Sequence, residues 1–182
     1  MIYPYLRTSL AIILGLTPLL SNACNVATGV EEAHGSDQYQ LSSSSLSVID
    51  LDSGLMWQRC AVGQSFSAAS NSCEGSATTY SDWYSALNAL ATLNSNNYDG
   101  YSNWRIPNVK ELWSVVETGC ASPAINITSF PNSPTGHFYS STPTRTTDAE
   151  GNGITAGQGL KVPFSFGSSS SLTYLRLVRT YN

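Results

Sequence analysis

One stretch near the middle of the chain constrains the fold more than any other: Trp104-Arg105-Ile106-Pro107-Asn108-Val109-Lys110-Glu111-Leu112. Pro107 fixes its own φ angle, and it pushes the preceding Ile106 toward extended backbone geometry. The chain therefore enters this stretch as an extended segment and must turn at the proline. We expect a structural corner with a buried Trp104.

The second half of the same stretch predicts the start of a helix. The side-chain oxygen of Asn108 can accept a backbone N–H of the first turn, and Glu111 stands where a carboxylate bonds back to the cap. Leu112, Trp113 and Val116 follow at helical spacing, and Gly119 supplies a stop. We therefore predict a short helix between Asn108 and Gly119.

The hydrophobic pattern of the rest of the chain predicts one α+β domain with two helices and short antiparallel strands. A second helix should begin near Thr79 or Ser81, with an apolar stripe made of Trp83, Ala86, Leu87, Leu90 and Leu93. Period-two patterns and turn residues predict a hairpin over residues 47–58, a strand over 137–142, and two closing strands over 160–166 and 172–180.

The N-terminus has the form of a signal peptide over residues 1–23. Arg7 is the only early charge, residues 10–20 are apolar, and small residues stand at Ser21 and Ala23. The apolar run is too short for a comfortable transmembrane helix. We therefore expect export, with cleavage after Ala23.

Cys24 would then become the first residue of the mature chain, which leaves two destinations open. Lipoprotein signals place a lipid-modified cysteine at this position, although Ser21 stands where those signals usually have leucine. The chain is therefore either a lipoprotein of the cell envelope, touching the membrane only through Cys24, or a secreted protein. Residues 24–46 have the composition of a polar tether, and the folded domain is assigned to residues 47–182.

Charge excludes one class of partner. Only 11% of the residues are charged, and the formal net charge is −4. Nucleic-acid binding normally uses a basic surface, so we expect no nucleic-acid partner.

Four cysteines, Cys24, Cys60, Cys73 and Cys120, suit an oxidising compartment. Cys60 and Cys73 bracket a polar loop, and we expect a disulfide between them. If Cys24 carries lipid, Cys120 is left as a free, buried thiol; if Cys24 is unmodified, a Cys24–Cys120 disulfide becomes available. Without a CxxC pair or paired histidines, no zinc site is expected.

No set of residues indicates catalysis, so we predict no enzyme activity and no cofactor. Asp82, Glu111 and Glu117 are better explained by helix capping and solvation than by acid–base work. Asp148-Ala149-Glu150-Gly151-Asn152 begins like a calcium loop, but Gly159 occupies the position of its terminal acidic ligand. A solvated loop is the preferred interpretation there.

Two sets of side chains are candidates for carbohydrate binding. Aromatic rings that could stack on sugars are Tyr98, Tyr101 and Tyr174. Cations that could form a basic groove are Arg105, Lys110, Arg145 and Arg176.

Several separated motifs, in order, resemble one bacterial family. They are Gly54-Leu55-Met56-Trp57-Gln58-Arg59-Cys60, the stretch 104–112, Pro123-Ala124-Ile125-Asn126, Phe130-Pro131-Asn132, Tyr139-Ser140-Ser141-Thr142 and Leu175-Arg176-Leu177-Val178-Arg179. Together they look like the C-terminal domain of the collagen-like adhesin Lcl, over residues 50–180. The resemblance implies an exported domain that is distantly similar to C-type-lectin-like folds and is associated with binding of sulfated polysaccharide and attachment. This chain lacks a collagen-like repeat, so the resemblance implies no trimeric stem.

We therefore expect an exported, non-enzymatic binding or adhesion module that recognises extracellular polysaccharide. The alternative is a structural accessory domain of a cell-envelope assembly that binds a protein partner. The sequence names neither the ligand nor the oligomeric state.

Overall fold

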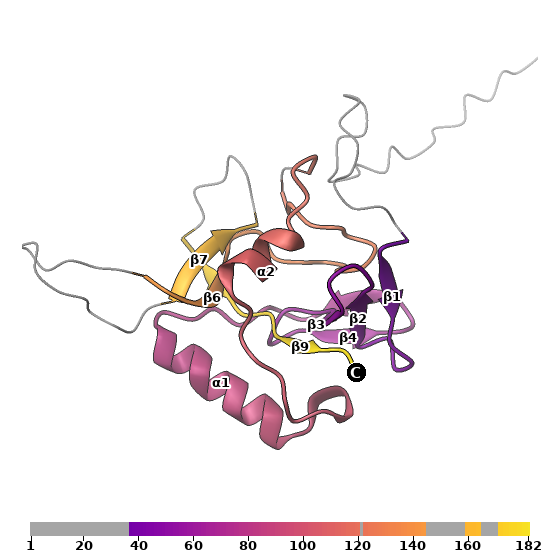
Figure 1. The fold of residues 1–182 in the computed structure, drawn as a ribbon, viewed down its shortest axis with the longest axis horizontal. Coiled ribbons are helices and arrows are strands. Elements are labelled where there is room, and N and C mark those ends of the chain that lie inside the picture. The colour runs from indigo at the N-terminus through magenta and orange to yellow at the C-terminus, as the bar shows by residue number, and fades with distance from the viewer. Residues whose placement is uncertain (1–36, 121, 145–158, 165–170) are drawn as a thin grey trace, which may run out of the picture.

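The structure is a computed structural model that describes residues 37–120, 122–144, 159–164 and 171–182. These residues form a single α+β domain, as predicted (Figure 1). None of the described helices is long and apolar enough to span a membrane. The predictions for the signal peptide over residues 1–23, for Cys24 and for the 148–152 loop lie outside the described residues.

Three small sheets make up the β-structure of the described residues. The largest has the order β1-β2-β3-β9, with bounds Tyr39–Leu41, Ser47–Asp50, Leu55–Gln58 and Val178–Thr180. A second has the order β7-β6-β8, with bounds Gly159–Pro163, His137–Pro143 and Thr173–Tyr174. The third pairs β4 (Ser65–Ser67) with β5 (Ser72–Glu74). The β2–β3 hairpin confirms the prediction for residues 47–58.

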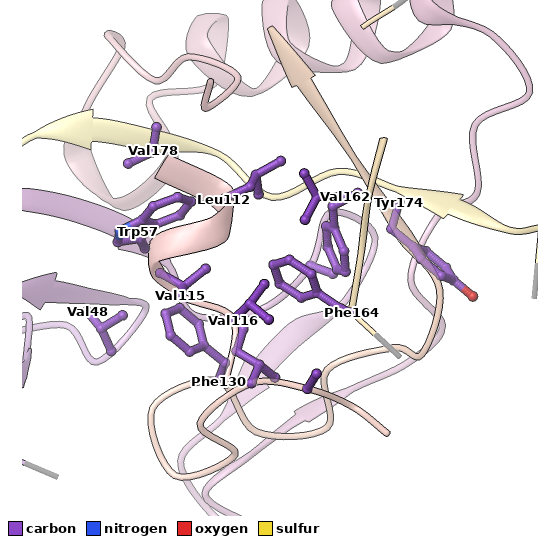
Figure 2. Close-up of a cluster of buried hydrophobic side chains, with 14 residues drawn as sticks. Val48, Trp57, Leu112, Val115, Val116, Phe130, Val162, Phe164, Tyr174 and Val178 are labelled. Carbon is purple, nitrogen blue, oxygen red and sulfur yellow. The ribbon is translucent and has the colours of Figure 1, made fainter. Parts of the chain in front are cut away.

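The two helices belong to two hydrophobic clusters that lie on opposite faces of the main sheet. Helix α2 (Val109–Ser114) covers a cluster that contains Val48 and Trp57 (Figure 2). Helix α1 (Trp83–Ser95) covers a second cluster, which contains Ile49 and Met56. Because alternate side chains of a strand point to opposite faces, β2 and β3 are buried on both sides. Strands β2 and β3 therefore lie between the two hydrophobic clusters.

Helix α1 begins slightly later than the sequence suggested. Asp82 is its N-cap, and the Asp82 carboxylate accepts the Ser85 backbone N–H at 2.8 Å. The predicted starts at Thr79 and Ser81 were wrong because this carboxylate satisfies the first turn. Leu87 was also misplaced, since it is 37% exposed rather than part of the buried stripe.

Helix α2 ends at Ser114, well before Gly119. Val115 and Val116 are β-branched and buried, and Val116 forms an isolated antiparallel bridge with Ile125. Glu117 is 1% exposed, and its backbone N–H donates to Ala124 O. Glu117 is therefore not the solvated helical residue that we predicted. Pairing with the following segment outweighs continuation of the helix.

The two closing strands do not form a hairpin with each other. Strands β7 and β8 lie on either side of β6, and β8 runs parallel to β6. Strand β9 joins β3 in the main sheet instead. Residues 173–179 are all buried, so one continuous strand was a reasonable prediction, but its two ends belong to different sheets.

The described end of the predicted tether is part of the fold. Strand β1, inside residues 24–46, pairs antiparallel with β2, and Tyr39 lies opposite Asp50. The Tyr39 ring packs edge-on against Phe130, with 5.4 Å between ring centroids. The folded domain therefore begins before residue 47.

Candidate ligand-binding surface at helix α2

The backbone and the side chain of Trp104 fix the corner at Pro107 that leads into α2. Its backbone N–H donates to Asn94 Oδ1 at 2.9 Å, and Asn94 Nδ2 donates to Trp104 O at 2.8 Å. Its indole N–H donates to Tyr98 O at 2.8 Å. Trp104 is 2% exposed, which confirms the predicted burial. The next residue, Arg105, exchanges two backbone hydrogen bonds with Val178, so the corner is tied to β9.

A complete capping box starts α2. Asn108 Oδ1 accepts the backbone N–H groups of Lys110 and Glu111, and Glu111 Oε2 accepts the Asn108 N–H at 2.7 Å. Val109 N–H donates to Thr142 Oγ1 at 3.0 Å. The free N–H groups of the first turn are thereby satisfied, as the sequence predicted for Asn108 and Glu111.

Arg105 adds a two-point ion pair to this box. Its Nη1 and Nη2 donate to the two carboxylate oxygens of Glu111 at 2.7 and 2.6 Å. Partial burial of the Glu111 carboxyl opposes ionisation, but the bonds from Arg105 and Asn108 and the Arg105 charge outweigh it and lower its pKa. The hydrogen bond to Glu111 raises the pKa of Arg105. The box therefore holds a fixed, ionised pair at the foot of the helix.

The outward side of α2 presents an aromatic ring beside a cation. Leu112 is fully buried, whereas Trp113 is 46% exposed and Lys110 is exposed. Residues three apart on a helix are neighbours, so Lys110 and Trp113 share one face. We call Lys110 and Trp113, with the Arg105–Glu111 pair at their edge, the α2 surface.

Trp113 differs from the other three tryptophans. Trp57 and Trp104 are buried in the core, and Trp83 is half-buried against α1's cluster. From the sequence we expected Trp113 to follow at helical spacing together with Leu112 and Val116. That placement was wrong for Trp113, which is 46% exposed, whereas Leu112 and Val116 are buried.

The three tyrosines that the sequence suggested for stacking on sugar rings are instead packed against other groups of the domain. The Tyr98 ring packs edge-on against Trp104 with centroids 5.7 Å apart, and Tyr174 is only 8% exposed. Tyr101 stacks under the Arg179 guanidinium, whose carbon lies 3.9 Å from the ring centroid. All three rings serve packing, which is the more common role of such tyrosines.

The suggested basic groove is not formed by the described residues. Arg176 is completely buried, and its Nη1 donates to Gln58 O and Arg59 O at 2.8 and 2.6 Å. Burial lowers the pKa of Arg176 to about 9. Arg105 and Lys110 remain together at the α2 surface, while Arg145 lies outside the described residues.

Comparison with known families decides the relationship suggested by the motifs. A family model described as the Lcl C-terminal domain matches residues 46–179. The chain belongs to the Lcl C-terminal domain family. The match includes both helices and all of the α2 surface, whereas β1 precedes it. No curated protein matches the chain significantly, and neither does any solved structure.

The likeness to C-type-lectin-like folds stays a prediction for this Lcl C-terminal domain. The family match supports an adhesin-related domain, and it names no ligand for this chain.

Cysteine pairing in this Lcl C-terminal domain agrees with the first expectation. Cys60 and Cys73 form a disulfide that joins the β4–β5 hairpin to the end of β3. Cys120 is 1% exposed and is also disulfide-bonded. The free buried thiol that would accompany a lipidated Cys24 is therefore not observed at Cys120, whose partner lies outside the described residues.

The chemistry of the α2 surface fits binding. Its carboxylate, Glu111, is held by Arg105 and by the Asn108 N–H, so it is occupied as a structural group. An indole face can cover the apolar face of a sugar ring, and an ammonium group can approach a carboxylate or sulfate. Within the described part of the chain, no group of three or more His, Cys, Asp and Glu residues could hold a metal ion.

Proposed function

We propose that this domain is an exported, non-enzymatic binding module that holds an anionic extracellular polysaccharide on the α2 surface. The observation that carries the proposal is the indole of Trp113, 46% exposed beside Lys110 on a helix whose start is fixed by a capping box. Leaving an indole half in water forgoes part of its favourable burial energy, so a ligand that covers it recovers that energy.

The charges of the α2 surface favour an anionic polymer. Lys110 forms no ion pair with another described residue, whereas Arg105 is paired with Glu111. One net positive charge therefore stands at this surface of a chain whose formal net charge is −4. Such a site attracts a sugar carboxylate or sulfate weakly, and repeated units along a polymer strengthen the attachment.

The test is a binding titration of the mature protein against heparin, alginate and neutral dextran. We expect Trp113→Ala to weaken binding of the anionic polymer about ten-fold or more, because the stacking surface is lost. Lys110→Ala should weaken it less and should reduce its salt dependence. The matched control is Tyr84→Ala, since Tyr84 is 70% exposed on α1, away from the α2 surface.

Equal binding by the Trp113→Ala variant and the wild-type protein would refute the role of the α2 surface. Equal losses in Trp113→Ala and Tyr84→Ala would also refute it, because a general surface effect would explain both. Binding of dextran as tightly as heparin and alginate would refute the anionic preference.

A protein partner is the second candidate, and the exposed side of α1 favours it. Tyr84 is 70% exposed and Leu87 is 37% exposed on this helix, which contains no charged residue. A neutral, partly apolar helix face is suited to contact with another protein of a cell-envelope assembly. Under this alternative, Tyr84→Ala rather than Trp113→Ala abolishes attachment.

We also propose that the mature chain is secreted with Cys24 paired to Cys120. The support is that Cys120 is disulfide-bonded, that Cys60 and Cys73 bond each other, and that the sequence has four cysteines. A thiol in a disulfide cannot carry lipid. Intact mass of the exported protein, with and without reduction, tests this: a gain of four hydrogens supports it, and a diacylglyceryl mass on Cys24 overturns it.

A further inference from the structure

Strand β1 is an addition at the edge of the main sheet. It precedes the family match, which starts at residue 46, and it pairs with β2 over three residue pairs. Gln38 reinforces the pairing, because its Nε2 donates to Asp50 Oδ1 at 3.1 Å and its carbonyl accepts Leu51 N–H. The strand is short, yet it is specifically bound.

Tyr39 fixes β1 to the core. Its ring packs edge-on against Phe130, a fully buried residue of the cluster beneath α2. The partner surfaces of β1 are therefore the edge of β2 and the ring of Phe130. Both belong to the body of the domain, and any copy of the chain offers the same two surfaces.

A tight turn connects β1 to β2 through residues 42–46, which we call the hinge. Ser45 N–H donates to Ser42 O at 2.9 Å, and Ser45 has a φ of 61°. A left-handed backbone costs a residue with a side chain about 1–2 kcal/mol, and glycine is the usual residue there. The closed hinge is therefore strained.

The carboxylate of Asp99 keeps the hinge closed. It accepts hydrogen bonds from the hydroxyls of Ser44 and Ser47 at 2.5 and 2.6 Å and a longer one from Ser42 at 3.5 Å. Asp99 lies in a different loop, about fifty residues away in the sequence, so these bonds join two separate turns. Opening the hinge would break the bonds from Ser42 and Ser44.

We propose that β1 exchanges between two copies of this chain to form a strand-swapped dimer, with Asp99 as the latch that favours the closed monomer. In the exchanged form, β1 pairs with β2 of the partner, and Tyr39 packs against the partner's Phe130 ring. The same contacts therefore form between the two chains as within the monomer. The strain at Ser45 is released, and the Asp99 bonds to the hinge are lost. Short strained hinges favour such exchange.

The exchange gives a pair of domains with two α2 surfaces. Two linked sites bind a polymer more tightly than one, without any new contact. This consequence rests on the proposed polysaccharide function, whereas the exchange itself does not. Failure of polysaccharide binding would leave the dimer measurable, and failure of dimer formation would leave the Trp113 titration intact.

The experiment measures mass by sedimentation after refolding of the reduced, unfolded mature chain at graded concentrations. The chain is refolded from the reduced state because Cys120 is disulfide-bonded in the folded protein. In the reduced chain, β1 can pair with its own β2 or with that of a partner before this bond forms. We expect a mainly monomeric wild type and a strongly dimeric Asp99→Asn variant. In each of the two chains, losing the Asp99 hydrogen bonds should lower the preference for the closed hinge roughly ten-fold. The association constant of the dimer should therefore rise about a hundred-fold. Asp37→Asn is the control, since Asp37 is exposed beside β1 and carries the same charge change.

Two further variants separate strand exchange from ordinary association. Ser45→Gly removes the strain of the closed hinge in each of the two chains and should lower the dimer constant of Asp99→Asn about a hundred-fold. Tyr39→Ala in the same background removes the anchor of β1 and should abolish the dimer. A monomeric Asp99→Asn variant that retains its native circular dichroism spectrum overturns the proposal. A dimer that survives Tyr39→Ala overturns it as well.

Discussion

Arg105 and Arg176 lie in two regions of the molecule and differ in burial and in the partners of their guanidinium groups. At the α2 surface, Arg105 is 42% exposed over its side chain and meets both oxygens of Glu111. In the interior, Arg176 is fully buried and bonds to two backbone carbonyls and to Ser133 Oγ, with the rings of Phe130 and Phe138 nearby. One arginine shapes a surface, and the other fills a core.

The difference shows why a count of basic residues misjudges the surface of this protein. Arg59 and Arg179 are also buried, at 2% and 6% exposed, and each stacks on an aromatic ring. A guanidinium is planar and weakly hydrated, so it can replace an apolar side chain between rings while it donates to carbonyls. Among the described residues, the outer surface is therefore left with Arg105, Lys110 and Lys161 as its main cations.

The largest effect is expected from breaking the buried region with Arg176→Met. Methionine keeps apolar bulk against Phe130 but leaves the carbonyls of Gln58 and Arg59 without this donor. Each buried acceptor that loses its partner costs about 1–3 kcal/mol, so we expect a loss of about 3–5 kcal/mol in the free energy of unfolding. Equilibrium denaturation in urea measures it.

Arg176→Lys is the matched control, because it keeps the charge and loses the planar fork. It should be destabilised as well, since one ammonium cannot reproduce the directions of the donors toward Gln58, Arg59 and Ser133. A Met variant as stable as the wild type would contradict our view, and would mean that the guanidinium is only tolerated in the core.

A smaller, pH-dependent effect is expected at the exposed region from Glu111→Gln. The ionised Glu111 bonds to Arg105 and Asn108, which lowers its pKa in the folded state despite partial burial. Its contribution is therefore present above the ordinary glutamate pKa of 4.5 and is lost as the pH falls through the lower folded value. We expect the variant to lose up to about 1 kcal/mol at neutral pH.

Urea denaturation of both proteins from pH 7 to pH 3 measures this effect. The stabilities of Glu111→Gln and wild type should converge at the acid end. A constant difference across this range would show that the carboxylate charge has no part in the capping box.

The sequence predicted the corner at Pro107 because its signals are local. The proline, the Asn108 cap and Glu111 act within one turn of chain, and the structure confirms each of them. The β2–β3 hairpin and the Cys60–Cys73 bond were predictable for the same reason. Neighbouring residues contain enough information for such features.

What the sequence did not predict depends on distant partners. Arg176 looks like any basic residue of a strand until Gln58, Ser133 and Phe130 surround it. Strand β1 looked like a tether, because three residues show no clear alternation, and it needs the edge of β2 to form. The sheet to which β8 and β9 belong likewise depends on β6 and β3, far away in sequence.

The smallest effect on stability is expected from Trp113→Ala, and it sharpens the contrast between surface and core within one helix. Trp113 is 46% exposed, whereas its neighbour Leu112 is fully buried beneath it. Trp113→Ala should change the free energy of unfolding by about 0.5 kcal/mol or less, because its surface contributes little to the core. Leu112→Ala should cost about 2–5 kcal/mol through the cavity it leaves. Urea denaturation of the two variants decides the point: a stable Trp113→Ala protein that has lost heparin binding identifies the indole as a binding group, whereas a loss as large as that of Leu112→Ala would identify it as a core residue and remove the reason for placing a ligand there.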